Sequence, residues 1–301
     1  SVTGNTAGND FRVEASGNIT VDDAVSGTDV ALVTDNGGIA VNQSVTATSD
    51  AVLNASGDIT GNGTVSASNL GLDAANIGTA ANSLNIDTNN LAVNADTNAF
   101  VDDSDAVTLV NSVTATAAND SVTGNTAGND FRVEASGNIT VDDAVSGTDV
   151  ALVTDNGGIA VNQSVTATSD AVLNASGDIT GNGTVTSPNL GLDAANIGTV
   201  ANPMNIDADN LAVNADTNAF VNDTDDVTLV NSVTSTGAND SVTGNSAGND
   251  FRVEASGNIT VDDAVSGTDV ALVTDGGGIA VNQSVTATSD AVLNASGDIT
   301  G

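Results

Sequence analysis

The sequence predicts an all-β fold, a parallel β-solenoid in which the chain winds in coils of about 20 residues. The prediction rests on a strand-turn-strand unit, first seen in residues 11–29, that recurs along the chain. In this unit alternate residues from Phe11 to Ala15 share one face of an extended strand, and Ile19 and Val21 face the same way after a turn. The next units start 19 or 21 residues apart, at Val30, Ala51, Leu70 and Leu91.

Each element of the unit has its own signal. Strands are favoured over helices because Thr, Val, Asn, Asp and Gly dominate and no stretch repeats every 3.6 residues. Corners are predicted at residues 16–18, 36–38 and 56–58, where we expect Gly and Asn to adopt positive φ angles. The fifth unit should continue from Leu91 into Phe100 or Val101. Large inward residues become sparse over 99–130, which predicts a looser or bulged coil there.

A longer period of 120 residues is nested over the coils. Residues 1–120 form a first copy, 121–240 a second and 241–301 a partial third, and 1–60 are identical to 121–180. Six coils would account for each copy, and about 15 coils for the chain. Because the sequence starts inside the pattern and stops within a copy, we expect one continuous solenoid that is a segment of a longer chain.

Composition excludes several classes of function. The chain holds 39 acidic residues against three arginines, a formal net charge of -36, and contains no Cys, His, Lys, Trp or Tyr. Since the usual general bases and nucleophiles are missing, we predict no catalytic or cofactor-binding residues. The negative charge argues against nucleic acid and anionic lipid partners, and no apolar run is long enough to insert into a membrane.

Paired carboxylates are the candidate metal ligands. Alignment of the coils places Asp22-Asp23 and Asp102-Asp103 at the same corner, separated by coils whose corners are neutral. Carboxylate oxygens suit Ca²⁺, so this corner is a candidate calcium site. The alternative is a solvated acidic corner, because the GGxGxD calcium repeat is absent and the second copy has Asn222 in place of Asp102. The candidate calcium ligands are Asp22, Asp23, Asp102, Asp103, Asp142 and Asp143.

Other polar and aromatic residues have structural interpretations. Asparagines at the corners are expected to form hydrogen bonds with one another along the stack. Arg12 faces outward beside Glu14, which predicts a surface ion pair worth under about 1 kcal/mol, with a binding role for Arg12 as the alternative. Phe11 and Phe100, the only large rings of the first copy, are expected to fill the core.

Several stretches resemble a known family. They are ALVTDNGGIAVNQSVTA, AVLNASGDITGNGTVSA, and NIGTAANSLNID followed by LAVNADTNAFVDD and VTLVNSVTA. In their style of repeat they resemble the repeat region of filamentous haemagglutinin-like giant adhesins of bacterial outer surfaces. The resemblance implies a right-handed parallel β-helix, secretion by a two-partner or autotransporter route, and a shaft that holds functional tips away from the bacterial cell surface.

Three functions remain as hypotheses. The first is a structural shaft of an extracellular filament or adhesin, a rigid spacer whose specificity for a cell-surface or glycan target lies in terminal domains outside this sequence. Its expected partners are other copies of itself in a fibre or bundle. The second is an acidic surface that binds cations or glycans. The third is a polysaccharide-degrading β-helix enzyme, against which the recurrence of every acidic group from copy to copy argues.

Overall fold

A computed structural model describes residues 5–115, 120–235 and 240–301, and the chain divides into two compact units, Ser1–Thr148 and Asp149–Gly301. The fold is an all-β parallel β-solenoid of about 14 turns with roughly 20 residues in each. The predicted fold class is therefore confirmed. The described part of the chain contains no helix with the length and apolarity that a membrane span requires.

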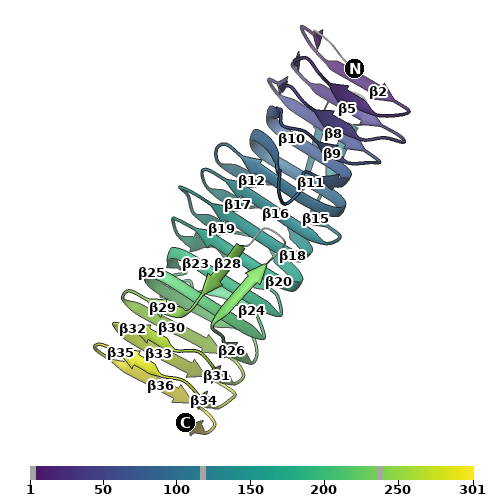
Figure 1. The fold of residues 1–301 in the computed structure, drawn as a ribbon. Coiled ribbons are helices and arrows are strands. Elements are labelled where there is room, and N and C mark those ends of the chain that lie inside the picture. Colours follow the sequence, from purple (N-terminus) through teal and green to yellow (C-terminus); the bar gives the residue numbers. More distant parts are fainter. Residues whose placement is uncertain (1–4, 116–119, 236–239) are drawn as a thin grey trace. The chain divides into compact units, whose positions relative to one another are not determined.

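The strands are numerous, and their lengths range from 2 to 20 residues (Figure 1). Those of the first unit are β1 (Asn5–Thr6), β2 (Phe11–Ala15), β3 (Ile19–Val21), β4 (Val25–Gly27), β5 (Val30–Thr34), β6 (Ile39–Val41), β7 (Val45–Ala47), β8 (Asp50–Ala55), β9 (Ile59–Thr60), β10 (Thr64–Ile77), β11 (Leu84–Asp103), β12 (Val107–Leu109), β13 (Ser112–Ala115), β14 (Asp120–Thr123), β15 (Asn125–Ala127), β16 (Asp130–Ala135) and β17 (Ile139–Val141). The strand β18 (Val145–Thr154) spans the boundary.

Those of the second unit are β19 (Ile159–Val161), β20 (Val165–Ala175), β21 (Ile179–Thr180), β22 (Thr184–Thr186), β23 (Asn189–Ile197), β24 (Met204–Asp207), β25 (Asn210–Asp223), β26 (Val227–Leu229), β27 (Ser232–Ser235), β28 (Asp240–Thr243), β29 (Asn245–Ala247), β30 (Asp250–Ala255), β31 (Ile259–Val261), β32 (Val265–Gly267), β33 (Asp269–Thr274), β34 (Ile279–Val281), β35 (Val285–Ala287), β36 (Ala291–Ala295) and β37 (Ile299–Thr300).

A regular turn contains three strands, one more than the predicted strand-turn-strand unit. In the turn β5, β6 and β7, the third strand places Val45 and Ala47 toward the core, where both are buried. Each strand pairs in parallel with its counterpart one turn away, so that Val25 stacks on Val45 and Ile39 on Ile59. Identical aliphatic side chains therefore form columns inside the wall, which is why a 20-residue spacing of small apolar residues specifies this fold.

The corner glycines serve a different purpose from the one predicted. Positive φ angles occur at other glycines, among them Gly61 and Gly78, and at none of the glycines of the predicted corners. At the corners the backbones of neighbouring turns approach closely: a Cβ on Gly37 would lie 2.5 Å from the backbone nitrogen of Asn18. Glycine is needed at position 37 because the neighbouring corner leaves no room for a side chain there, whereas a Cβ on Gly17, in the first corner, would have no atom within 4 Å.

Two antiparallel strand pairs lie outside the parallel wall. In the first unit β13 and β14 pair from Ser112 with Thr123 to Ala115 with Asp120, and we call this pair the first strap. In the second unit β27 and β28 form the second strap, and Figure 1 shows β28 lying across the stacked strands. Within the stretch 99–130, where the sequence predicts a looser coil, residues 112–115 and 120–123 form the first strap, while β12, β15 and the end of β11 stay in the parallel wall. Residues 116–119 lie outside the described ranges.

The first strap changes the count of turns in a copy. Because β13 and β14 pair with each other outside the wall, six turns in each 120-residue copy is wrong. The strand β15 repeats β1 in sequence, yet it stacks on Val93–Ala95, in the stretch of β11 that corresponds to β2. The second copy therefore begins one strand position further round the turn. In the second unit β29 stacks on β25 in the same way.

Candidate functional site

The predicted calcium ligands of the first corner are exposed. Asn42 Nδ2 donates a hydrogen bond to Asp22 Oδ1 at 2.9 Å, and the backbone N–H of Ala24 donates to Asp23 Oδ1 at 3.0 Å. At the matching corner of the second copy, the backbone N–H groups of Asp142 and Asp143 both donate to the carbonyl of Leu109. These four aspartates lie where the sequence predicts, after the strand that starts with Ile19 or Ile139.

Asp102 and Asp103 do not belong to that corner, so this part of the predicted alignment is wrong. Both lie within β11, where Asp102 pairs with Glu134 and Asp103 with Ala135 of β16. The residue that stacks on Ile77 is Ala99, whereas Phe100 pairs with Arg132 and lies on the outward side of the strand. The alternation Ala99, Val101, Asp103 explains the error, because it turns an acidic side chain toward the core.

Asp103 and its second-copy counterpart Asp223 are fully buried carboxyl groups. Asp103 accepts hydrogen bonds from the backbone N–H groups of Asp105, at 2.8 Å, and Thr88, at 3.2 Å. Burial raises the pKa of Asp103 to about 6 and that of Asp223 to about 7, against the hydrogen bonds that lower both. A buried acid of this kind titrates between mildly acidic and neutral pH.

Within residues 5–115, 120–235 and 240–301, no three acidic side chains gather in an arrangement that could hold a metal ion. The exposed corner at Asp22 and Asp23 offers two carboxylates and the corner at Asp142 and Asp143 two more. Protein calcium sites usually supply six to eight oxygen ligands, so each corner would need many more oxygens than its carboxylates provide. The calcium role of these aspartates stays a prediction.

Asparagine ladders run along the stack, as the sequence predicts. In the second unit Asn196 Nδ2 donates to Asp178 Oδ1 at 2.8 Å, Asn218 Nδ2 to Asn196 Oδ1 at 3.0 Å, and Asn249 Nδ2 to Asn218 Oδ1 at 3.1 Å. The first unit contains the same ladder from Asp58 to Asn129. These amides are occupied in holding neighbouring turns together.

The second-unit ladder borders an open groove of about 540 Å³, which Thr199, Val200, Ala201 and Phe220 also line. Val200 stands at its edge with 70% of its surface exposed. Phe220 itself is buried. The groove is therefore shallow and open, and amides, small side chains and the apolar surface of Val200 line it.

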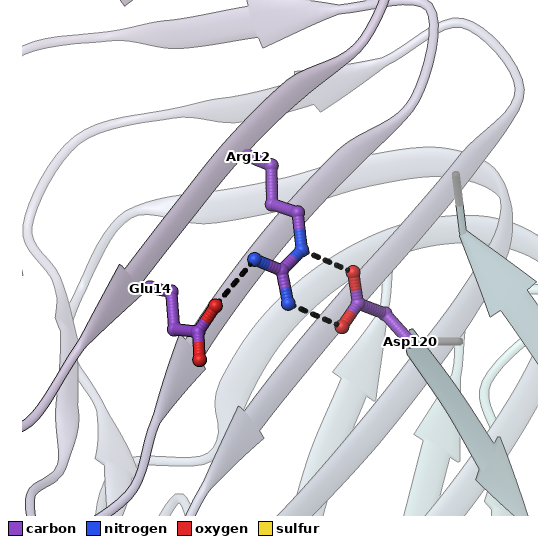
Figure 2. Close-up of polar contacts among 3 residues, drawn as sticks. All are labelled: Arg12, Glu14 and Asp120. Atoms are coloured by element: carbon purple, nitrogen blue, oxygen red, sulfur yellow. Dashed lines mark hydrogen bonds and ion pairs between the residues drawn. The ribbon is translucent and has the colours of Figure 1, made fainter. Parts of the chain in front are cut away.

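The first strap is held by an ion pair that the sequence did not predict. Arg12 Nε donates to Asp120 Oδ2 at 2.8 Å and Arg12 Nη2 donates to Asp120 Oδ1 at 3.1 Å. Arg12 Nη1 donates to Glu14 Oε2 at 2.6 Å, which confirms the predicted surface pair. Figure 2 shows the guanidinium lying between the two carboxylates. Arg12 therefore joins the wall to the strap.

A small apolar cluster lies beneath the first strap. Its members come from outward positions of the wall and from the inner side of the strap. The buried members are Val52, Ala92, Val113, Ala115 and Val122, with Val110 partly buried against them. Gly71 lies between Val52 and Ala92 in the wall, and a Cβ there would come within 3.0 Å of Val122. The glycine at position 71 therefore leaves the space in the wall that Val122 of the strap occupies.

The second strap repeats this arrangement in its own unit. Its apolar cluster contains Val172, Ala212, Val233 and Val242. The buried hydroxyl of Ser235, which replaces Ala115, donates to the carbonyls of Val150 and Asp170 at 3.1 and 3.3 Å. A Cβ on Gly191 would lie 2.9 Å from Val242, so glycine is required at the same place.

Comparison of the chain with protein-family models, with curated proteins and with solved structures finds no match.

Proposed function

We propose that this chain is part of the shaft of an extracellular bacterial filament or giant surface adhesin, where it acts as a rigid spacer. The observation that supports this proposal best is that the same structural features recur from copy to copy. Each full copy carries the same aliphatic columns, the same amide ladder and its own strap. Because the columns, the ladder and the strap recur in each full copy, they stabilise the wall along its length. A single ligand site would instead be expected to make one turn differ from the others.

The strap supports a mechanical role because it joins turns that are far apart in the sequence. Arg12 and Asp120 are 108 residues apart. Between them the strap packs on Val52 and Ala92, which belong to different turns. Contacts between neighbouring turns alone leave a solenoid free to open at any interface, so a strap over several turns opposes local opening.

Adhesion at the bacterial surface is the finer part of the proposal, and it follows from the resemblance of the repeats to giant adhesins. The experiment is an attachment assay on whole bacteria that express the full-length protein, compared with a variant that lacks one interior copy, residues 121–240. We expect the protein at the cell surface and attachment at unchanged affinity in both strains. Loss of partner recognition in the variant, with its terminal domains intact, would show that the shaft itself binds.

A further inference from the structure

Asparagine followed by glycine occurs four times in the chain, in two kinds of corner. Asn36-Gly37 and Asn156-Gly157 lie between the first and second strands of a turn, whereas Asn62-Gly63 and Asn182-Gly183 lie between the second and third. Asparagine is chemically labile when the backbone nitrogen of the next residue can reach its side chain, and glycine hinders this approach least because it has no Cβ. The four pairs therefore share one local chemistry, and only the folded structure distinguishes them.

In the first kind of corner the attacking nitrogen is unpaired. Asn36 and Asn156 are exposed, while the glycines that follow them are buried. Across the described ranges, neither the two asparagine side chains nor the N–H groups of Gly37 and Gly157 take part in a hydrogen bond. A buried N–H without a partner has no hydrogen bond to lose when it reacts.

In the second kind of corner the same nitrogen is paired with the preceding turn. Gly63 N–H donates to the carbonyl of Val41, and Gly183 N–H donates to the carbonyl of Val161, both at 2.8 Å. The glycines of both kinds of corner are buried. The two kinds therefore differ in the hydrogen bonding of the attacking nitrogen and not in the burial of the glycine.

We propose that Asn36 and Asn156 are sites of spontaneous deamidation in the folded protein, and that Asn62 and Asn182 are protected from it. The nitrogen of the following glycine attacks Cγ of the asparagine, so that an N–Cγ bond forms, the Cγ–Nδ2 bond breaks and ammonia leaves with the proton of the N–H. Water then opens the resulting cyclic imide. One water is consumed and one ammonia is released, without oxidation or reduction. This chemistry is independent of the proposed role as a spacer.

The corner also selects the product. Opening of the imide at Cγ gives aspartate, whereas opening at the main-chain carbonyl gives isoaspartate, which adds a methylene to the backbone. A Cβ on Gly37 would lie 2.5 Å from the backbone nitrogen of Asn18, and the Thr34 hydroxyl and the Gly57 N–H both donate to the Gly37 carbonyl. A longer backbone has no room there, so we expect aspartate, which places a new carboxylate beside Asp35.

The test is peptide mapping of the whole chain by mass spectrometry after incubation in mildly alkaline buffer. We expect Asn36 and Asn156 to react at least about tenfold faster than Asn62 and Asn182, because one hydrogen bond at the attacking nitrogen accounts for a factor of about this size. After unfolding in guanidinium chloride, all four asparagines should react at similar rates and isoaspartate should appear among the products.

The double variant Asn36→Gly with Asn156→Gly removes the proposed sites, and the third copy already carries Gly276 at this position. The folded variant should release ammonia at least about tenfold more slowly than the unsubstituted chain. Asn62→Gly with Asn182→Gly is the matched control and should keep most of the release. Melting temperatures verify that both variants are folded.

Two results would overturn the proposal. Equal rates at all four asparagines of the folded chain would show that the hydrogen bond at the glycine nitrogen does not govern the reaction. Absence of reaction at Asn36 and Asn156 in the folded chain, with normal reaction after unfolding, would show that the stacked corners protect them.

Discussion

Arg12 and Asp120, which are 108 residues apart in the sequence, form a bidentate ion pair. Arg12 Nε lies 2.8 Å from Asp120 Oδ2, and Arg12 Nη2 lies 3.1 Å from Asp120 Oδ1. The carboxyl side chain is 7% exposed and the guanidinium 33%. Charge-assisted pairs of this geometry are stronger than ordinary surface pairs. The pair therefore attaches the strap to a turn that is far from it in the sequence.

Removal of this pair is expected to loosen the first strap. In Arg12→Gln the carboxylate of Asp120 loses its two charged donors while it stays largely buried, at a cost of about 1 to 3 kcal/mol. Native-state hydrogen exchange at Val113 and Val122 measures the loss locally. Glu14→Gln is the control, because Glu14 is exposed and its pair should contribute under about 1 kcal/mol. Equal protection of the strap in both variants would contradict a holding role for Asp120.

Substitution of the glycine beneath the strap is expected to displace the strap. In Gly71→Val the added side chain meets Val122, whose atoms would lie 3.0 Å from the Cβ alone. The wall should stay folded while hydrogen-exchange protection of Val113 and Val122 disappears. Gly17→Val is the matched control, since a Cβ at Gly17 has no atom within 4 Å. A strap that keeps its protection in Gly71→Val would show that the packing described here is wrong.

The buried carboxyl groups predict a pH dependence of stability. The folded state raises the pKa of Asp103 to about 6 and that of Asp223 to about 7, so it favours their protonated forms. The resulting stabilisation is complete below pH 3.8, the ordinary pKa, and is lost as the pH rises through about 6 and about 7. For Asp103 it is on the order of 3 kcal/mol. Thermal melting should therefore occur at lower temperature at pH 8 than at pH 5.

The control for this pH dependence is a variant with the same change of net charge. The double variant Asp103→Asn with Asp223→Asn should flatten the pH profile between 5 and 8. Asp35→Asn with Asp155→Asn removes two exposed carboxylates and should keep the profile. If both double variants flatten the profile equally, general charge repulsion and not the buried pair causes the dependence.

Salt is expected to stabilise the protein by screening its net charge of -36. The described acidic side chains form no three-membered cluster, so we expect Ca²⁺ to raise the melting temperature no more than NaCl of equal ionic strength. Calorimetry at matched ionic strength makes the comparison. An extra effect of Ca²⁺ that Asp22→Asn and Asp142→Asn remove would establish calcium binding at those corners.

The sequence predicted the wall well because its signal is local. Alternation from Phe11 to Ala15 and the return of Ile19, Ile39 and Ile59 every 20 residues fix which side chains face inward. The third strand had a signal that the prediction did not use, namely the return of Val25, Val45 and Val65 at the same spacing. The right-handed winding implied by the resemblance stays a prediction.

The strap and the buried acids were missed because their signals are not local. The stretch SVTA followed by DSVT alternates like two strands of a hairpin, but nothing in it says that it leaves the wall. Its partner Arg12 lies 108 residues away. Alignment of the coils by their spacing places Asp103 at a corner, and only the register of β11 on β16 reveals that this buried side chain points inward.

We propose that copies set length without setting specificity, and electron micrographs of the full-length protein with one 120-residue copy inserted test this proposal. Each copy adds about five and one third turns, because its first strand stacks one strand position further round than its counterpart. At roughly 4.8 Å per turn, the solenoid should lengthen by about 26 Å, less than the 29 Å or so of six turns, with attachment unchanged. An unchanged length, or a solenoid of the expected length that no longer supports attachment, would show that copies do not act as spacers.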